Sequence, residues 1–366
     1  MHILHVVGAR PNFMKVAPVL RALATRPGVE QTLLHTGQHY DANMSDIFFE
    51  QLGIPRPDIA LGVGSGTHAQ QTAQIMVKFE EAVVEKSPDW VLVYGDVNST
   101  VAAAMVCAKL RIPVAHVEAG LRSFDRDMPE EINRLVTDQL ADLLLTPSVD
   151  GDENLKREGI PGTRIRCVGN VMIDTLVRLL PQARLPEVAL SSPFALVTLH
   201  RPSNVDEPET LRQILTTLID LSVDCQMVFP VHPRTRKRIA DLGLQFPAGD
   251  RFLLLEPLGY LECLALQKQA AAVVTDSGGI QEESTYLGVP CLTLRENTER
   301  PVTITHGSNQ LIGTDMELLR HEFANVLNGR GKQGKRPPLW EGRASERIAD
   351  ILTGRDAVAE PLRRAA

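Results

Sequence analysis

Two successive series of short apolar runs, each run followed by a longer amphipathic stretch, constrain the fold of this chain more than any other feature. Runs rich in Val, Ile and Leu with crossover helices between them are typical of parallel strands buried on both faces of a sheet. The first series predicts strands at Ile3–Val7, Gln31–Leu34, Trp90–Val93, Val114–Val117 and Leu143–Thr146. The second predicts strands at Ala195–Leu199, Gln226–Pro230, Phe252–Leu255, Ala272–Thr275 and Cys291–Thr293. The predicted fold class is α/β, with two doubly wound parallel-sheet domains of the Rossmann-like kind.

The two series also divide the chain of 366 residues into two domains of ordinary size. We expect residues 1–169 to form the first domain and residues 170–345 the second, with a C-terminal helix within 346–366 packing back on the first. Doubly wound sheets bind ligands at the carboxyl ends of their strands. Two such sheets facing each other predict one ligand cleft.

Composition excludes several classes of partner. The formal net charge is −7 and the basic residues are scattered, so the chain has no electrostatic footprint for nucleic acid or an anionic membrane. Its five cysteines lie far apart without a C-x-x-C pair, which fits neither a disulfide framework nor a zinc site. No run approaches the roughly 20 apolar residues that span a bilayer. We therefore expect a cytoplasmic protein with no nucleic-acid or membrane partner.

Carboxylates follow two neighbouring predicted strands and begin the next helix. Asp96 follows the strand at Trp90–Val93, Glu118 follows the next strand, and Glu130 opens a helix a short loop later. Clustered carboxylates raise one another's pKa, which is how a general acid or base near neutral pH can be made. Asp96 could instead cap its helix, and for Glu131 we favour a simple complement to the helix dipole. Glu118 is the strongest candidate, because an acid directly after a buried strand is costly unless it is paired or functional.

Two segments have the character of anion sites. The first strand ends in Gly8, followed by Arg10 and Lys15 at a helix start, where two cations could hold a diphosphate. An Arg and a Lys that are merely solvated beside a helix N-terminus would give the same sequence pattern. In the second series, Ser277-Gly278-Gly279 lies between a strand and a helix, where free backbone amides can donate hydrogen bonds to phosphate oxygens.

The second series carries further candidate residues around that glycine turn. Glu282 and Glu283 lie one turn inside the helix, where a carboxylate can take ribose hydroxyls. His200 follows the strand at Ala195–Leu199, and Arg300 could supply a further positive charge.

These segments together resemble one family, the non-hydrolysing bacterial UDP-N-acetylglucosamine 2-epimerases, which have the GT-B architecture. The resemblance covers nearly the whole chain and rests on Gly8-Ala9-Arg10-Pro11 with Lys15, Gly95-Asp96, His116 to Arg122, Pro129-Glu130-Glu131, His200-Arg201, Ser277 to Glu283, and Glu299-Arg300-Pro301. It implies acid/base roles for Asp96, Glu118 and Glu130, further roles in the reaction for Lys15 and His200, and UDP binding by Arg10, Ser277, Gly278, Gly279, Glu283 and Arg300.

The resemblance also implies a reaction. UDP is eliminated from UDP-N-acetylglucosamine to leave a 2-acetamidoglucal, and UDP is then added back as a proton is returned to the opposite face of C2. This reaction requires no metal and no nicotinamide, and its product is a precursor of surface polysaccharide. We also expect a homodimer.

Alternatives remain open at this point. A sister family acts on UDP-2,3-diacetamido-2,3-dideoxyglucuronate, and Gly37 to Asp41 and Ser123 to Asp125 resemble both families. A GT-B glycosyltransferase, a hydrolysing epimerase and a non-catalytic nucleotide-sugar sensor are more distant alternatives. Gln38, His39 and His232 resemble residues through which a second substrate molecule activates some members. The chain departs from the family pattern at Asn12-Phe13 and after Pro257, where some members place an aromatic residue near the uracil.

Overall fold

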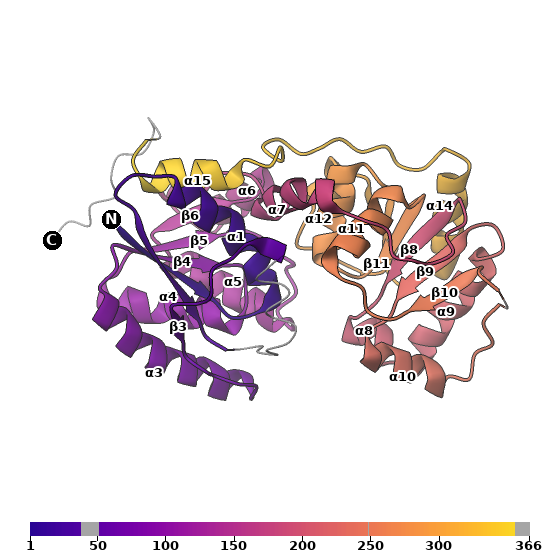
Figure 1. The fold of residues 1–366 in the computed structure, drawn as a ribbon, viewed down its shortest axis with the longest axis horizontal. Helices are drawn as coiled ribbons and strands as arrows, with labels where there is room; N and C mark the ends of the chain where they lie inside the picture. Colours follow the sequence, from indigo (N-terminus) through magenta and orange to yellow (C-terminus); the bar gives the residue numbers. More distant parts are fainter. Residues whose placement is uncertain (38–50, 248, 356–366) are drawn as a thin grey trace. The chain divides into compact units, whose positions relative to one another are not determined.

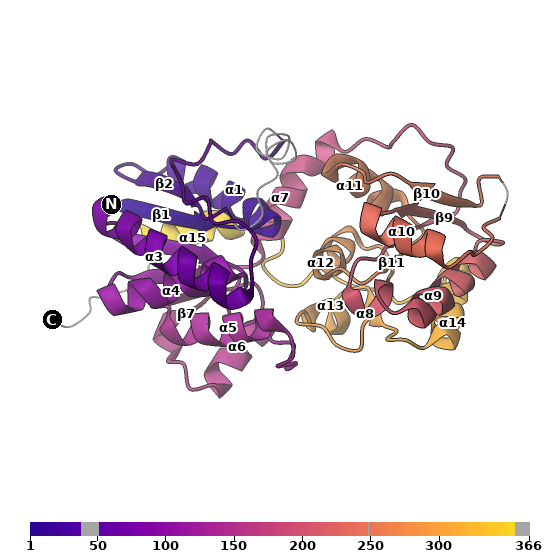
Figure 2. The same ribbon diagram turned by 90° about the horizontal axis from the view of Figure 1, so that it is seen from below.

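The computed structural model describes residues 1–37, 51–247 and 249–355, so Gln38 and His39 lie outside the described residues. The chain divides into two compact units. The first unit contains Met1–Thr175 and the chain from Pro338 onward, and the second contains Leu176–Pro337. Figures 1 and 2 show an α/β arrangement in each.

The first unit is built on a parallel sheet. Among the described residues its strands are β1 (His2–Val7), β2 (Glu30–His35), β3 (Ile59–Ala60), β4 (Trp90–Tyr94), β5 (Val114–Val117), β6 (Leu143–Thr146) and β7 (Ile165–Cys167). They lie in the order β3-β2-β1-β4-β5-β6-β7. Its helices are α1 (Arg10–Ala24), α3 (His68–Lys86), α4 (Asn98–Leu110), α5 (Pro129–Leu140), α6 (Val149–Arg157), the short η1 (Gly162–Arg164) and α15 (Ala344–Leu352), and α7 (Val171–Leu179) spans the boundary.

A second parallel sheet organises the other unit. Its described strands are β8 (Phe194–Thr198), β9 (Gln226–Pro230), β10 (Phe252–Leu255), β11 (Ala272–Thr275), β12 (Cys291–Thr293) and β13 (Asn309–Leu311), in the order β10-β9-β8-β11-β12-β13. Its helices are η2 (Leu180–Gln182), α8 (Pro202–Val205), α9 (Pro208–Leu221), α10 (Pro233–Asp241), α11 (Tyr260–Gln269), α12 (Gly278–Leu287), α13 (Val302–Thr305) and α14 (Met316–Leu327).

Helices cover both faces of each sheet, as the continuous apolar runs require. In the first unit Leu4 and Val6 of β1 belong to one core with Phe79 of α3. Figure 1 shows α3 and α4 on that side of the sheet and α1 with α15 on the other. In the second unit Val197 of β8 shares a core with α9 and α14, whereas Leu196 faces the core beneath α11.

The predicted fold class is confirmed, because both sheets are parallel and each is sandwiched between helices. Three strands that the sequence analysis did not predict, β3, β7 and β13, are two or three residues long and lie at sheet edges. An edge strand has few neighbours, so it needs no continuous apolar run.

The end of the chain returns to the first unit, where α15 packs on α1. The Asp174 carboxylate accepts hydrogen bonds from the Ala344 and Ser345 amides at 3.0 and 2.7 Å, which fixes the start of α15. The buried Trp340 indole donates to the carbonyl of Pro147 at 2.9 Å. Among the described helices, none is long and apolar enough to cross a lipid bilayer.

Candidate active site

The strand order of each sheet contains one point at which it reverses. In the first unit this point lies between β1 and β4, and in the second between β8 and β11. Doubly wound sheets bind ligands outside the carboxyl ends of the strands at such a point. Gly8 follows β1 and Asp96 follows β4, while His200 follows β8 and Asp276 follows β11. These four residues therefore lie where proteins of this fold class bind their ligands.

The turn after β1 is closed by an asparagine. The Asn12 side-chain oxygen accepts from the Gly8 and Ala9 amides, both at 3.0 Å, and its NH₂ group donates to the Tyr94 carbonyl at 2.7 Å. A Cβ on Gly8 would collide with the Ser99 hydroxyl, so the turn needs a glycine. Because Asn12 takes these two amides, they are not part of the anion site that the sequence suggested. Arg10 begins α1, and its side chain lies outside what the structure describes.

Glu118, which directly follows β5, forms an ion pair with Lys15 of α1. Both side chains are buried, with residue exposures of 5% and 6%. The backbone of Glu118 has a φ of 75°, which a non-glycine residue rarely adopts. Gly95 lies against the pair, because a Cβ there would be 2.6 Å from Lys15 Nζ and 3.2 Å from the Glu118 carboxylate.

Asp96 is held by helix α5. Its carboxylate forms an ion pair with the Arg134 guanidinium, and its carbonyl accepts from Asn133 at 2.8 Å. Arg134 is 2% exposed and also donates to Glu131 at 2.7 and 3.0 Å. Glu130 lies half-buried in the first turn of the same helix. One helix thus carries Glu130 and fixes Asp96.

Glu131 does more than complement the helix dipole, the role that the sequence analysis favoured for it. Its carboxylate, 2% exposed, accepts from the amides of Ser123 and Phe124, each at 3.0 Å. Burial alone would raise the pKa of Glu131, but the Ser123 amide and Arg134 outweigh it and lower that pKa. Glu131 therefore fixes the loop between β5 and α5.

A buried polar chain connects α5 to the strand ends. His116 Nδ1 lies 2.6 Å from Asp138, its Nε2 lies 2.8 Å from the Gly95 carbonyl, and Asp138 also accepts from Arg122 at 2.7 Å. Burial would raise the pKa of Asp138, yet His116 and Arg122 hold it below its usual range. The His116 ring thus bridges the Asp138 carboxylate and the Gly95 carbonyl. This chain fixes the Gly95–Asp96 peptide.

In the second unit His200 and Asp276 meet across the β8/β11 switch point. His200 Nδ1 lies 2.9 Å from the fully buried Asp276 carboxylate, which also accepts from the backbone amides of His200 and Arg201. Burial favours the neutral acid, but these partners lower the pKa of Asp276. The His200 side chain is 56% exposed, so its ring is held by Asp276 at a solvent-facing position.

The glycine pair that begins α12 packs against Arg300. A Cβ on Gly278 would lie 2.6 Å from Arg300 Nη1, whereas Gly279 has open space around it. Arg300 forms ion pairs with Glu299 and, at 2.9 Å, with Glu282. Burial opposes ionisation of Glu299, but Arg300 and Arg295 lower its pKa far below the usual range. The positive charge of Arg300 is thus held beside the turn by two carboxylates.

Glu283 differs from its neighbour Glu282. It is buried, and its carboxylate accepts from the Tyr260 hydroxyl at 2.9 Å. Burial raises the pKa of Glu283 to about 7, although the Tyr260 hydrogen bond acts in the opposite direction. Tyr260 belongs to α11, in the segment after Pro257 where the sequence departs from the family pattern. This pair was not visible in the sequence, because 23 residues separate its members.

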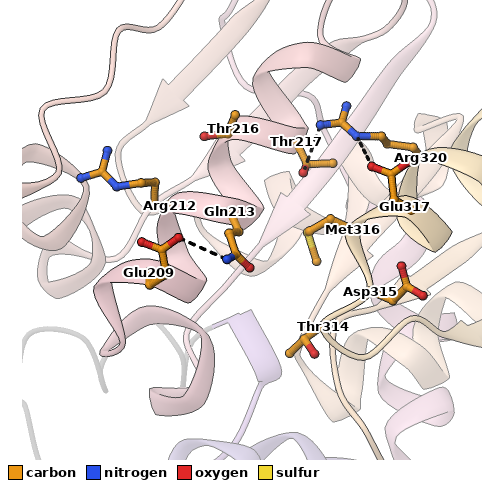
Figure 3. A pocket seen from close by; sticks show the side chains of 10 residues that line it. All are labelled: Glu209, Arg212, Gln213, Thr216, Thr217, Thr314, Asp315, Met316, Glu317 and Arg320. Atoms are coloured by element: carbon orange, nitrogen blue, oxygen red, sulfur yellow. Dashed lines mark hydrogen bonds and ion pairs between the residues drawn. The ribbon is translucent and has the colours of Figure 1, made fainter.

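A hollow of about 550 Å³ on the second unit lies between α9 and α14 (Figure 3). Arg320 on its wall is paired with Asp220 at 2.7 Å and with Glu317 at 3.4 Å. The hollow contains none of the candidate residues. Among the described residues, no group of three or more His, Cys, Asp or Glu side chains is placed to hold a metal ion.

Two doubly wound parallel units with these residues at their switch points define an α/β enzyme of the GT-B class. The chain belongs to the UDP-N-acetylglucosamine 2-epimerase family, whose family model matches residues 21–353. The resemblance found in the sequence is thereby confirmed. Over 360 residues the chain is 42% identical to the UDP-N-acetylglucosamine 2-epimerase of Methanocaldococcus jannaschii, covering 95% of this chain and 98% of that one.

Two further comparisons bear on substrate and fold. The chain is also 42% identical, over 96% of its length and 99% of the relative's, to the UDP-2,3-diacetamido-2,3-dideoxy-D-glucuronate 2-epimerase of Pseudomonas aeruginosa. The crystal structure of the M. jannaschii enzyme in complex with UDP-GlcNAc and UDP is similar, with a TM-score of 0.87 over 97% of this chain and 100% of that chain at 42% identity.

Proposed function

We propose that this enzyme interconverts UDP-N-acetylglucosamine and UDP-N-acetylmannosamine by eliminating UDP to form a 2-acetamidoglucal and adding it back. The observation that carries the proposal is the set of acids at the carboxyl ends of β4 and β5 and at the start of α5. Asp96 and Glu118 follow adjacent strands, and Glu130 opens the helix that fixes Asp96. Family membership supports the same reaction.

The chemistry explains why more than one carboxylate is needed. The C2 hydrogen of a nucleotide sugar is not adjacent to a carbonyl, so the anomeric C–O bond must break as the proton leaves. In our proposal one acid among Asp96, Glu118 and Glu130 removes the C2 proton, and another returns a proton to the opposite face. Lys15 holds Glu118 in place, as its ion pair with that acid indicates.

The leaving UDP needs positive charge and hydrogen-bond donors. We assign this role to Arg10, Arg300 and the amides of Ser277, Gly278 and Gly279 at the start of α12, where the helix dipole favours an anion. His200, oriented by Asp276, serves as a proton donor to the departing group. Glu283 takes the ribose hydroxyls, which lie one helical turn from the phosphate site in this assignment.

Three further features belong to the proposal. We place the enzyme in the cytoplasm, supplying precursors of surface polysaccharide, a location that agrees with five unpaired cysteines. We expect a homodimer, since Val77 and Val84 lie seven residues apart on α3 and remain 63% and 57% exposed. Light scattering coupled to size exclusion measures the molecular mass directly, and a monomer would contradict this part.

Incubation with UDP-N-acetylglucosamine in deuterated water tests the proposal. We expect deuterium at C2 of an epimer that is still joined to UDP, observed by NMR. Release of free N-acetylmannosamine with UDP would instead place the chain with hydrolysing epimerases, and recovery of undeuterated substrate would contradict the elimination route.

The second candidate substrate is UDP-2,3-diacetamido-2,3-dideoxyglucuronate. It is favoured by the equal identity, 42%, to relatives named for each substrate. Parallel kinetics with both nucleotide sugars decide between them, because the true substrate will have the larger kcat/KM.

A further inference from the structure

Phe124, in the loop between β5 and α5, combines two unfavourable properties. Its residue is 71% exposed, the largest value among the exposed large apolar residues that the structure describes. Its φ is 59°, in the left-handed region that bulky residues avoid. A backbone in this state persists only where the surroundings enforce it, and such positions concentrate at ligand sites.

Glu131 enforces this geometry. Its buried carboxylate accepts from the Phe124 amide, the Ser123 amide and the Ser123 hydroxyl, all at 3.0 Å. The Ser123 hydroxyl also accepts from the Asp125 amide at 3.3 Å. The loop backbone is thus fixed on both sides of Phe124 while the ring itself gains little burial.

The same arginine that holds Glu131 also holds a candidate acid. Arg134 donates to Glu131 at 2.7 Å and forms an ion pair with Asp96, and it lies 3.4 Å from the Ser123 hydroxyl. The buried guanidinium of Arg134 therefore links the loop that contains Phe124 with the Asp96 carboxylate, which follows β4.

We propose that the Phe124 ring contacts the sugar of the bound UDP-sugar and contributes to selection of the sugar, an inference that rests on the proposed function. The carbon-bound hydrogens of a pyranose face and the methyl of an acetamido group are apolar, and the face of an aromatic ring is a suitable partner for both. In this proposal the ring contacts the sugar and not the UDP part.

Calorimetric titration of UDP and of UDP-N-acetylglucosamine into the wild type and three variants tests this contact. In Phe124→Gly and Phe124→Asn the backbone conformation remains accessible because both residues tolerate a positive φ. We expect each variant to bind the nucleotide sugar about tenfold more weakly and UDP unchanged. Leu339→Gly is the matched control, because Leu339 also has a positive φ, 65°, and is 37% exposed. Its two affinities should equal those of the wild type.

Each remaining outcome is decisive. Equal loss of affinity for UDP and the nucleotide sugar, no loss at all, or loss in Phe124→Gly but not in Phe124→Asn would each overturn the contact, as would a wild-type chain that does not bind the nucleotide sugar. Deuterium incorporation by the wild type tests the proposed function separately. Selective loss of affinity without deuterium incorporation would retain the contact and reject epimerisation.

Discussion

At the scale of single residues, Glu118 carries two costs that packing does not explain. A positive φ at a non-glycine residue costs on the order of 1 kcal/mol, and removing an ion pair from water carries a further desolvation penalty. Both costs arise at Glu118, which directly follows β5 and lies beside Gly95. Backbone strain of this kind persists mainly at functional sites, which supports our proposal that Glu118 is one of the acids of the reaction.

Glu118→Gln should lower kcat by roughly 10²–10⁴, because the variant cannot transfer a proton at that position. UDP affinity should stay unchanged. The variant also leaves Lys15 buried without its carboxylate, which costs about 3 kcal/mol, so the assay temperature must stay well below the measured Tm. Glu85→Gln, a change at an exposed acid on α3, is the control. Wild-type turnover in Glu118→Gln would remove Glu118 from the mechanism.

Glu283 predicts a pH dependence of stability. Its pKa is about 7 in the folded chain against an ordinary 4.5, so its contribution is fully present below pH 4.5 and is lost as the pH rises through 7. The difference corresponds to about 3 kcal/mol. Urea unfolding at pH 5 and pH 8 should show a smaller loss in Glu283→Gln than in the wild type, and equal losses would show that Glu283 does not titrate as described.

The sequence placed Asp96, Glu118 and the glycine turn after strands, because the apolar run of each strand is plain, and it placed Glu130 at a helix start. It did not predict Arg134, Asn133 or Asp138 as part of the same site. On a helix, Glu131 and Arg134 at positions i and i+3 have the spacing of an ordinary solvated pair. Only the packing of α5 against the strand ends shows that both are buried.

At the scale of secondary-structure elements, α5 organises the first switch point. It supplies Glu130, fixes Asp96 through Arg134, fixes the preceding loop through Glu131, and reaches His116 through Asp138. The strands were easier to predict than these roles, since apolar runs report burial directly. The polar face of a helix gives the same sequence pattern whether it faces water or a polar site.

Two partners of Arg122 allow a direct comparison of burial. Asp138→Asn removes a fully buried charge from between Arg122 and His116, and should cost about 3 kcal/mol of unfolding free energy. Glu158→Gln removes the other partner of the same arginine, whose side chain is 25% exposed, and should cost about 1 kcal/mol or less. Urea unfolding measures both. Similar costs would mean that burial does not set the strength of this network.

At the scale of the whole molecule, the C-terminal segment belongs to the first unit although it follows the second in sequence. The sequence analysis expected a C-terminal helix that packs back on the first domain, but it did not predict the hydrogen bonds from Ala344 and Ser345 to Asp174, which join residues 170 and 171 positions apart in the chain. Local sequence patterns cannot predict a hydrogen bond between residues so far apart in the chain. The first unit thus depends on residues that follow the whole of the second.

A chain ending at Pro337 should therefore lose the first unit and keep the second. The deletion exposes the α1 surface beneath Ile348 and Leu352 and removes the buried Trp340. Three large apolar side chains at about 1.5–3 kcal/mol each amount to most of the 5–15 kcal/mol that stabilises a domain. Hydrogen exchange should show loss of protection in β1 and α1 but not in β8 and α9. A chain ending at Arg355 retains α15 and should exchange like the wild type; equal protection in the two truncated chains would show that the first unit folds without its C-terminal segment.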